Sequence, residues 1–177
     1  MKVELTPEEV ADALDLASQR HEAKHASVRD TGAISRATIP KGTPLEDFIP
    51  DRRYRAHFIG LLGEVAYAKA TGGEIDRNIY SGGDSHLGDV GRVEIKTATW
   101  MGPDVHLKIT ERELQKENQP EKYVLARIDE KNFHCVELIG EIGRDDFMEK
   151  SISKKYGRSY PQNQIMDAED LDPIPTQ

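Results

Sequence analysis

The segment from Asp89 to Lys96 brings two carboxylates and a lysine close together around a predicted tight turn. Gly91 and Arg92 suit the two central positions of a β-hairpin turn, and glycine at the first of them favours type II′ geometry. Such a turn would pair Asp89 with Glu94 across the two strands. Because strand side chains alternate between faces, Asp89, Glu94 and Lys96 are then expected on one face.

This arrangement of charges has a direct chemical consequence. Two carboxylates that face each other on a sheet repel, and a cation bound between them would turn the repulsion into attraction. Oxygen ligands of this kind suit Mg²⁺, which takes one or two carboxylates and keeps waters for a phosphate substrate. The lysine adds a positive charge beside the same spot. The segment therefore predicts a site that cleaves phosphodiester bonds.

The neighbouring elements would complete this site. A helix is predicted over residues 52–70, because Gly72 and Gly73 follow it as a stop signal. Glu64 lies late in that helix, at the end that precedes the hairpin. Val90, Val93 and Ile95 point away from the charged face and are expected in the core. The sequence further predicts strands over 105–109, 123–128 and 134–139 and a helix over 110–117.

The pattern Asp-x4-Glu-x-Lys on a predicted hairpin resembles the catalytic signature of the PD-(D/E)XK nuclease superfamily. The resemblance covers about residues 52–140 and includes Glu64 on the preceding helix and the later strand, helix and strand. Gly88 stands where the family name would place a proline. The resemblance implies an α/β fold with a restriction-endonuclease-like mixed central sheet flanked by helices, in the order αβββαβ, with an N-terminal helix and a C-terminal extension.

The resemblance also implies a role for each residue. Asp89 and Glu94 would bind Mg²⁺ or Mn²⁺, with the Ile95 carbonyl as a further ligand and Glu64 reaching the metal directly or through water. Lys96 would position or polarise the attacking water and offset charge in the transition state. One or two metals would both suit this set. The implied activity is hydrolysis of DNA phosphodiester bonds by an endonuclease, leaving a 3′-hydroxyl and a 5′-phosphate.

Length and composition limit the alternatives. The chain of 177 residues is expected to form one domain. No apolar run approaches the roughly 18 residues that a membrane-spanning helix requires, and no signal peptide is recognised. The single cysteine, Cys135, excludes an internal disulfide and favours the cytoplasm. The predicted parts are an N-terminal helix and connector (1–51), a nuclease-like core (52–140) and a C-terminal extension with an acidic tail (141–177).

The net charge of −8 is distributed unevenly. Residues 1–51 carry −4, residues 52–128 carry +1 and residues 129–177 carry −5. The acidic excess therefore lies outside the candidate core, and a nucleic-acid-binding protein needs a local basic patch rather than a basic average. Solvated surface charge is the plain alternative. The candidate nucleic-acid-binding residues are Arg52, Arg53, Arg55, His57, His86, Lys154 and Lys155, with Arg158 beside the last two.

The regions outside the core have local signals of their own. Thr6 and Glu9 form a predicted capping box, and Pro7 suits the first helical position. This helix is expected to continue to about Val28. We further expect a connector over residues 30–50, a helix over 144–155 and an extended or loosely held tail over 167–177.

Three other patterns give competing hypotheses. His21 and His25 form a His-Glu-x-x-His match, a spacing that binds Zn²⁺ in metalloproteases. The polar helix, the adjacent Lys24 and the lack of a recognisable third ligand favour packing instead. Asp84 is an alternative metal ligand, although its glycine-rich context favours a turn. Trp100 would be able to stack on a base, although packing is the commoner use.

The sequence leaves more than one class of function open. The leading hypothesis is a Mg²⁺-dependent deoxyribonuclease, which at this size would act as a homodimer or with a protein partner. The alternative is a catalytically weak or inactive nuclease-fold protein that binds DNA or protein, as the acidic flanks favour. A zinc metalloprotease using His21 and His25 is a third hypothesis. A stand-alone domain of this size suits a phage or mobile element.

Overall fold

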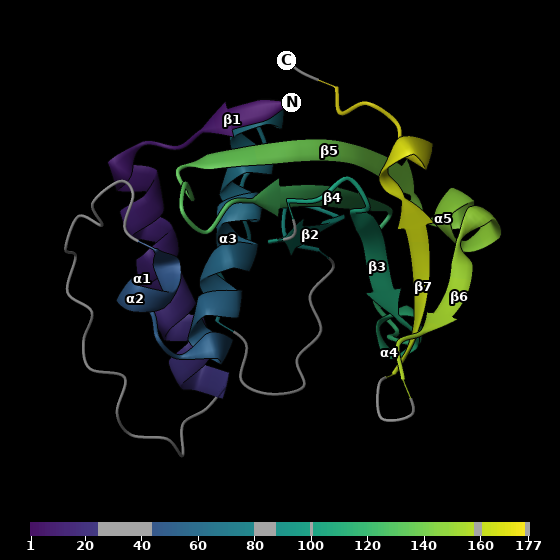
Figure 1. Cartoon of the computed structure of the whole chain (residues 1–177), viewed down its shortest axis with the longest axis horizontal. Coiled ribbons are helices and arrows are strands. Elements are labelled where there is room, and N and C mark those ends of the chain that lie inside the picture. The colour runs from purple at the N-terminus through teal and green to yellow at the C-terminus, as the bar shows by residue number, and fades with distance from the viewer. Residues whose placement is uncertain (25–43, 80–87, 100, 158–160, 176–177) are drawn as a thin grey trace.

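The computed structural model describes residues 1–24, 44–79, 88–99, 101–157 and 161–175. Within these ranges the strands form a four-stranded mixed sheet in the order β1-β5-β4-β2 and a three-stranded antiparallel sheet in the order β3-β7-β6. Helix α3 packs on the first sheet and α1 lies beside α3, and the second sheet stands at the other end of the first (Figure 1). No helix within the described ranges is long and apolar enough to cross a membrane.

Helices and strands are mixed along the described residues. They are β1 (Lys2–Glu4), α1 (Pro7–Lys24), α2 (Leu45–Phe48), α3 (Arg52–Thr71), β2 (Val93–Ala98), β3 (His106–Thr110), α4 (Glu111–Leu114), β4 (Lys122–Ile128), β5 (Cys135–Gly143), α5 (Arg144–Lys150), β6 (Ile152–Lys155), β7 (Gln162–Asp167) and the short 3₁₀ helix η1 (Ala168–Asp170).

Strand β2 is the edge strand of the first sheet as far as the chain is described. It runs parallel to β4, with Lys96 opposite Leu125. Parallel strands need a crossover connection, and here β3 and α4 supply it. Strands β4 and β5 then pair as antiparallel neighbours, and β1 closes the other edge. The crossover leaves one side of β2 without a strand partner among the described residues.

Helix α3 is defined by clear start and stop residues. The Asp51 side chain accepts a hydrogen bond from Tyr54 N at 2.7 Å, and Gly72 ends the helix with φ 70°. A Cβ added to Gly63 would lie 2.0 Å from Thr97 Oγ1 and 3.3 Å from Ile95 Cγ2. The helix therefore packs directly on the face of β2 that carries Ile95 and Thr97, and only glycine permits this approach.

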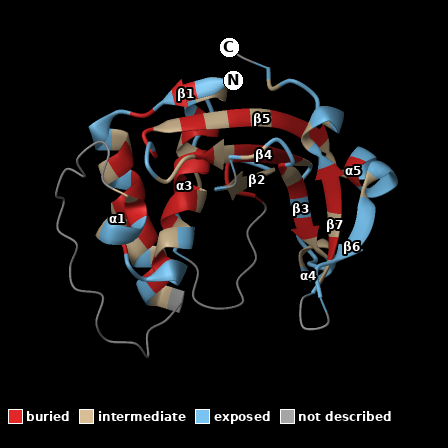
Figure 2. Cartoon of the chain, in the orientation of Figure 1, coloured by how far each residue is buried: buried red, intermediate tan, exposed pale blue. Residues whose placement is uncertain are grey.

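Two apolar clusters hold the layers together. The first lies between α1, α3 and one face of the first sheet, and contains Val124 and Ala126. The second lies between the opposite face, the second sheet and α5, and contains Tyr123 and Leu125. Strand β4 is buried on both faces, as central strands between two layers are. Figure 2 shows buried residues along α3, β4 and β5, whereas β6 is exposed throughout.

Several local predictions are confirmed. Thr6 N donates to Glu9 Oε2 at 2.7 Å and Glu9 N donates to Thr6 Oγ1 at 3.2 Å, which is the expected capping box. Helix α1 is described only to residue 24, so the predicted end near residue 28 lies outside the described residues. The helix over 52–70 and the strands over 105–109, 123–128 and 134–139 also agree with α3, β3, β4 and β5 within a few residues.

Other predictions need correction. The predicted helix over 144–155 ends at Lys150, and β6 follows it, because β6 pairs with β7 of the C-terminal extension. The predicted α/β class with a mixed sheet flanked by helices is confirmed, but not every strand of the predicted core joins that sheet. Strand β3 pairs with β7 instead of joining the first sheet, so the extension builds a second sheet. The tail is less loosely held than expected, since Asp172 N and Glu141 N each donate to the other's carbonyl at 2.8 Å.

Candidate active site

The predicted turn is present before β2. Val90 N donates to Val93 O at 3.2 Å and Val93 N donates to Val90 O at 3.1 Å. Gly91 has φ 62°, the positive value that the first central position of such a turn requires. The first strand of the expected hairpin is reduced to isolated bridges that join Val90 to Val93 and to Ile75. The turn prediction is confirmed, and the hairpin is shorter than expected.

Asp89 does not pair with Glu94 in a regular ladder. Its backbone N donates to Val93 O at 2.8 Å, and its carboxylate Oδ2 accepts from Ile95 N at 2.7 Å. The buried carboxylate is thereby tied to the backbone of β2. Gly88 before it has φ 156°, and a Cβ there would lie 2.7 Å from Val93 N. A larger residue at this position, proline included, would clash with the backbone of β2.

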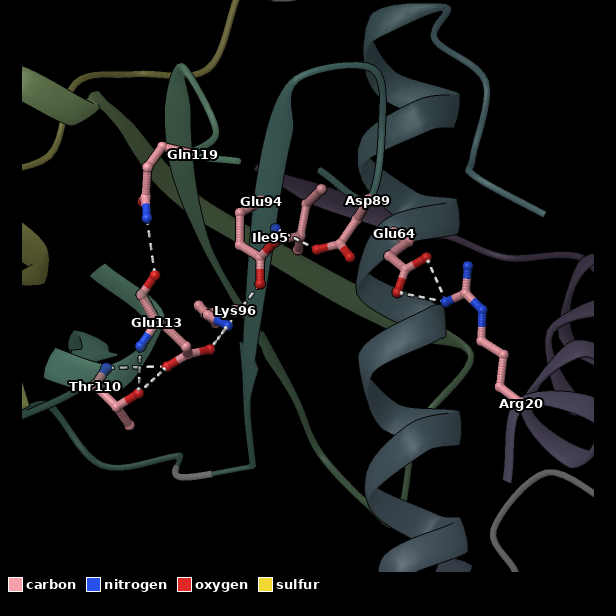
Figure 3. A network of polar contacts seen from close by, with 9 residues as sticks. All are labelled: Arg20, Glu64, Asp89, Glu94, Ile95, Lys96, Thr110, Glu113 and Gln119. Carbon is pink, nitrogen blue, oxygen red and sulfur yellow. Dashed lines mark hydrogen bonds and ion pairs between the residues drawn. The ribbon is translucent and has the colours of Figure 1, made fainter. Parts of the chain in front are cut away.

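Glu94 and Lys96 lie on the same face of β2, as predicted, with Lys96 Nζ 2.7 Å from Glu94 Oε1. Ile95 and Thr97 point to the opposite face, where α3 packs. Glu64 reaches the strand from α3. Figure 3 shows Asp89 between Glu64 and Glu94. The three carboxylates therefore gather around the edge of β2 rather than on one of its faces.

Glu64 is the most deeply buried acid of this group, with 5% of its surface exposed. Arg20 Nη1 lies 3.2 Å from Glu64 Oε2, and Arg20 Nη2 donates to the Asp76 carbonyl. Burial and the nearby negative charge of Asp89 outweigh the Arg20 charge and raise the pKa of Glu64 to about 8. The Glu64 carboxyl is therefore largely protonated at neutral pH when no other cation is near.

Lys96 is held by two carboxylates. Its Nζ lies 2.7 Å from Glu94 Oε1 and 2.5 Å from Glu113 Oε1 of α4. Burial on its own would lower the pKa of Lys96, but the charges of Glu94 and Glu113 outweigh it and raise this pKa above its ordinary value. Burial would likewise raise the pKa of Glu113, but the Lys96 charge and the Thr110 hydrogen bonds lower it to about 2. Both partners are therefore ionised at neutral pH.

The donor set fits a hard divalent cation in its chemistry. It consists of carboxylate oxygens only. Burial and the negative charge of Asp89 raise the pKa of Glu64, and a divalent cation would offset that negative charge. The geometry requires adjustment, because the described part of the chain contains no ready-made group of three His, Cys, Asp or Glu side chains placed for a metal. Both oxygens of Glu64 accept from Arg20, and Oε1 of Glu94 accepts from Lys96, so an ion shared by the two carboxylates would compete with these contacts.

The remaining residues that were predicted to bind a metal or nucleic acid form no part of this group of carboxylates, and several lie outside the described residues. His21 is buried and packs against the rings of Tyr54 and His57, with centroids 5.5 and 5.8 Å apart. Its proposed zinc partner, His25, is outside the described residues, as are His86, Asp84, Trp100 and Arg158.

The two basic clusters have different surroundings. Arg52 and Arg53 are exposed at the start of α3, roughly 18 Å along the helix axis from Glu64. Arg55 is engaged, with Nε 3.4 Å from Glu130 Oε2. Lys154 and Lys155 are exposed on β6, and the Lys154 Nζ lies 5.1 Å from the centre of the Tyr156 ring.

Two residues of the network, Arg20 and Glu113, were not predicted as site residues. Glu113 had a local signal, because its capping box with Thr110 is recognisable in the sequence and is confirmed here. The contact between Glu113 and Lys96 has no local signal in the sequence, since the two residues lie 17 positions apart. Arg20 is 44 positions from Glu64. Only the packing of α1 on α3, and of α4 beside β2, brings these groups into contact.

No family model, curated protein or solved structure matches this chain.

Proposed function

We propose that the chain is a divalent-metal-dependent endonuclease of the PD-(D/E)XK type that hydrolyses DNA. The observation that carries the proposal is the meeting of Glu64, Asp89 and Glu94 around the edge of β2, with the Lys96 ammonium beside them. Three acids and a lysine from a helix, a turn and a strand would provide both the ligands and the positive charge that phosphodiester hydrolysis requires.

Each residue has a role in this proposal. Asp89 and Glu94 would hold the ion, with the Ile95 carbonyl as a further ligand, and Glu64 would join after losing its proton and its contact with Arg20. A bound Mg²⁺ or Mn²⁺ would polarise the phosphate and lower the pKa of a bound water. Lys96 would donate a hydrogen bond to the attacking water or to a phosphate oxygen. In-line attack would leave a 3′-hydroxyl and a 5′-phosphate.

A binding function is the second candidate. The charged groups at the site already have partners in the folded chain, since Arg20 holds Glu64 and Lys96 joins Glu94 to Glu113. A protein that has kept the fold to bind DNA or another protein would need no exchange of these ion pairs. For either function we propose a cytoplasmic protein, on the basis of its single cysteine, that acts as a homodimer or with a protein partner.

The test is a cleavage assay on plasmid, linear duplex, single-stranded and branched DNA with Mg²⁺ or Mn²⁺. The variants are Asp89→Asn and Lys96→Ala, and the control is Arg92→Ala, since Arg92 is an exposed turn residue that pairs with Glu121. We expect metal-dependent cleavage by wild type and control, and a loss of about 10²-fold or more in both site variants. Cleavage that survives in both variants, or no cleavage and no metal binding by the wild type, would reject the nuclease assignment.

A further inference from the structure

The two carboxylates that hold Lys96 are anchored very differently. Glu94 lies on β2 beside the proposed metal position, whereas Glu113 lies on α4 (Figure 3). Glu113 uses its two oxygens for separate contacts. Oε1 accepts from Lys96 at 2.5 Å, and Oε2 accepts from Thr110 N at 2.9 Å and Thr110 Oγ1 at 2.7 Å. Gln119 Nε2 also donates to the Glu113 carbonyl at 3.0 Å. Glu113 is thus fixed in place independently of Lys96.

Binding of a cation by Glu94 creates a problem for Lys96. Glu94 Oε1 accepts from the Lys96 ammonium at 2.7 Å, so a cation bound through this oxygen would displace that contact. An ammonium that lost this partner without another would be left largely buried, since only 26% of the Lys96 side chain is exposed. Leaving such a charge without a counter-ion is costly. Glu113 offers the second counter-ion that would remove this cost.

We propose that Glu113 is a positioning residue that holds the Lys96 ammonium while Glu94 turns to a divalent cation. The inference rests on the metal site of the proposed function. Without Glu113, Lys96 would stay on Glu94 and compete with the metal for it. With Glu113, the ammonium stays beside the site and Glu94 becomes available. The role depends on the fixed position that Thr110 and Gln119 give to Glu113.

Glu113→Gln isolates this role. Glutamine has nearly the same size and can still complete a capping box with Thr110, but it lacks the charge that holds Lys96. Glu111→Gln is the matched control, because Glu111 is exposed in the same helical turn and the change removes the same charge. Thr110→Val removes the side-chain cap and keeps the Glu113 charge, so it measures how much of a change in metal affinity comes from loss of the helix cap alone.

The first readout is binding of Mn²⁺ alone, measured by calorimetry without DNA. We expect Glu113→Gln to weaken Mn²⁺ affinity by about 10- to 100-fold, as changes in groups that orient metal ligands do, and Glu111→Gln to bind like wild type. In cleavage assays Glu113→Gln should lower kcat and leave the KM for DNA unchanged. In a Lys96→Met background the effect of Glu113→Gln on Mn²⁺ affinity should disappear, because the competition between Lys96 and the metal is gone.

The possible results distinguish a failure of the proposed nuclease function from a failure of the role of Glu113. A wild type that binds no Mn²⁺ would overturn the proposed function and this inference together. Mn²⁺ binding by the wild type that is unchanged in Glu113→Gln would overturn only the role of Glu113. A loss of affinity that persists in the Lys96→Met background would also overturn it, because Glu113 would then act as a distant charge and not through Lys96.

Discussion

At the residue scale, two groups of the candidate site are held by side chains from other elements. Arg20 on α1 holds Glu64 on α3, and Glu113 on α4 holds Lys96 on β2. A divalent cation would therefore bind by displacing the Glu64 proton and the contacts with Arg20 and Lys96. Such displacement makes the balance between the pairs as important to metal affinity as the ligands themselves.

The protonation state of Glu64 gives a prediction that needs neither metal nor DNA. The pKa of Glu64 is raised from 4.5 to about 8 in the folded chain, because burial and the Asp89 charge disfavour its ionised form. Between these two values the folded state binds the proton more tightly than the unfolded state. The contribution of Glu64 to stability is complete below about pH 4.5 and is lost as the pH rises toward 8.

This linkage is measured by urea unfolding of wild type and Glu64→Gln at several pH values between 5 and 8. The variant stays neutral throughout and supplies the reference. We expect the free energy of unfolding of wild type, relative to the variant, to fall with pH by up to about 1.4 kcal/mol per pH unit. A relative stability that stays constant or rises over this range would show that Glu64 is ionised and held by Arg20.

At the element scale, the position of Glu64 depends on how closely α3 approaches β2. A Cβ at Gly63 would lie 2.0 Å from Thr97 Oγ1, whereas a Cβ at Gly60 on the same helix would meet nothing within 4 Å. We expect Gly63→Ala to destabilise the protein by about 1–3 kcal/mol through overpacking. Gly60→Ala should stabilise it by about 0.5–1 kcal/mol, since alanine favours a helix over glycine.

The two glycine variants are compared by thermal or urea unfolding under the same conditions. Because Gly63 is next to Glu64, Gly63→Ala should also weaken divalent-metal binding, and Gly60→Ala should leave it unchanged. Equal effects of the two substitutions on stability would show that α3 does not pack on β2 as closely as the structure has it.

The elements also show which parts of the fold can be predicted from sequence. The Thr6 and Thr110 capping boxes, the Gly72 stop and the Gly91 turn depend on residues a few positions apart, and all are confirmed. The pairing of β3 with β7 joins distant segments, and no local pattern specifies it. Strand β6 is exposed along its whole length and has no alternation of buried and exposed residues, so the sequence predicts a helix there instead.

The candidate site likewise has features that could be predicted from local sequence and features that depend on tertiary packing. Alternation along a strand correctly predicted that Glu94 and Lys96 share a face. It placed Asp89 in a regular pair with Glu94, but Asp89 is instead bound by the backbone amide of Ile95. The partners from other elements, Arg20 and Glu113, depend on tertiary packing. A pattern of residue types can therefore indicate the candidate metal ligands, but not the side chains from other elements that contact them and affect their protonation.

At the scale of the whole molecule, an acidic chain must present a local basic surface if it binds DNA. The second sheet carries a candidate, formed by Lys108, Lys154, Lys155 and Tyr156. Lys108 Nζ and Lys154 Nζ lie 4.9 and 5.1 Å from the centre of the Tyr156 ring, which is 44% exposed. Among the described residues, none of the three lysines has an ion pair with a carboxylate. Phosphate groups would supply that missing partner.

Replacing Lys154 and Lys155 together by alanine tests this surface. Each lysine that contacts a phosphate releases counter-ions on binding, so the slope of log K against log salt should decrease in magnitude by about 1 for each residue. Affinity for DNA of different sequences should fall to a similar extent. Binding would be measured by fluorescence anisotropy between low and moderate salt, with EDTA present to prevent cleavage.

Lys150→Ala is the matched control, because Lys150 is an exposed lysine at the end of α5, close in sequence but outside this surface. It should leave the slope unchanged. If the double variant and the control have the same salt dependence as wild type, β6 does not contact DNA. The exposed arginines at the start of α3, Arg52 and Arg53, would then be the basic groups to replace next, because they lie on the helix that carries Glu64.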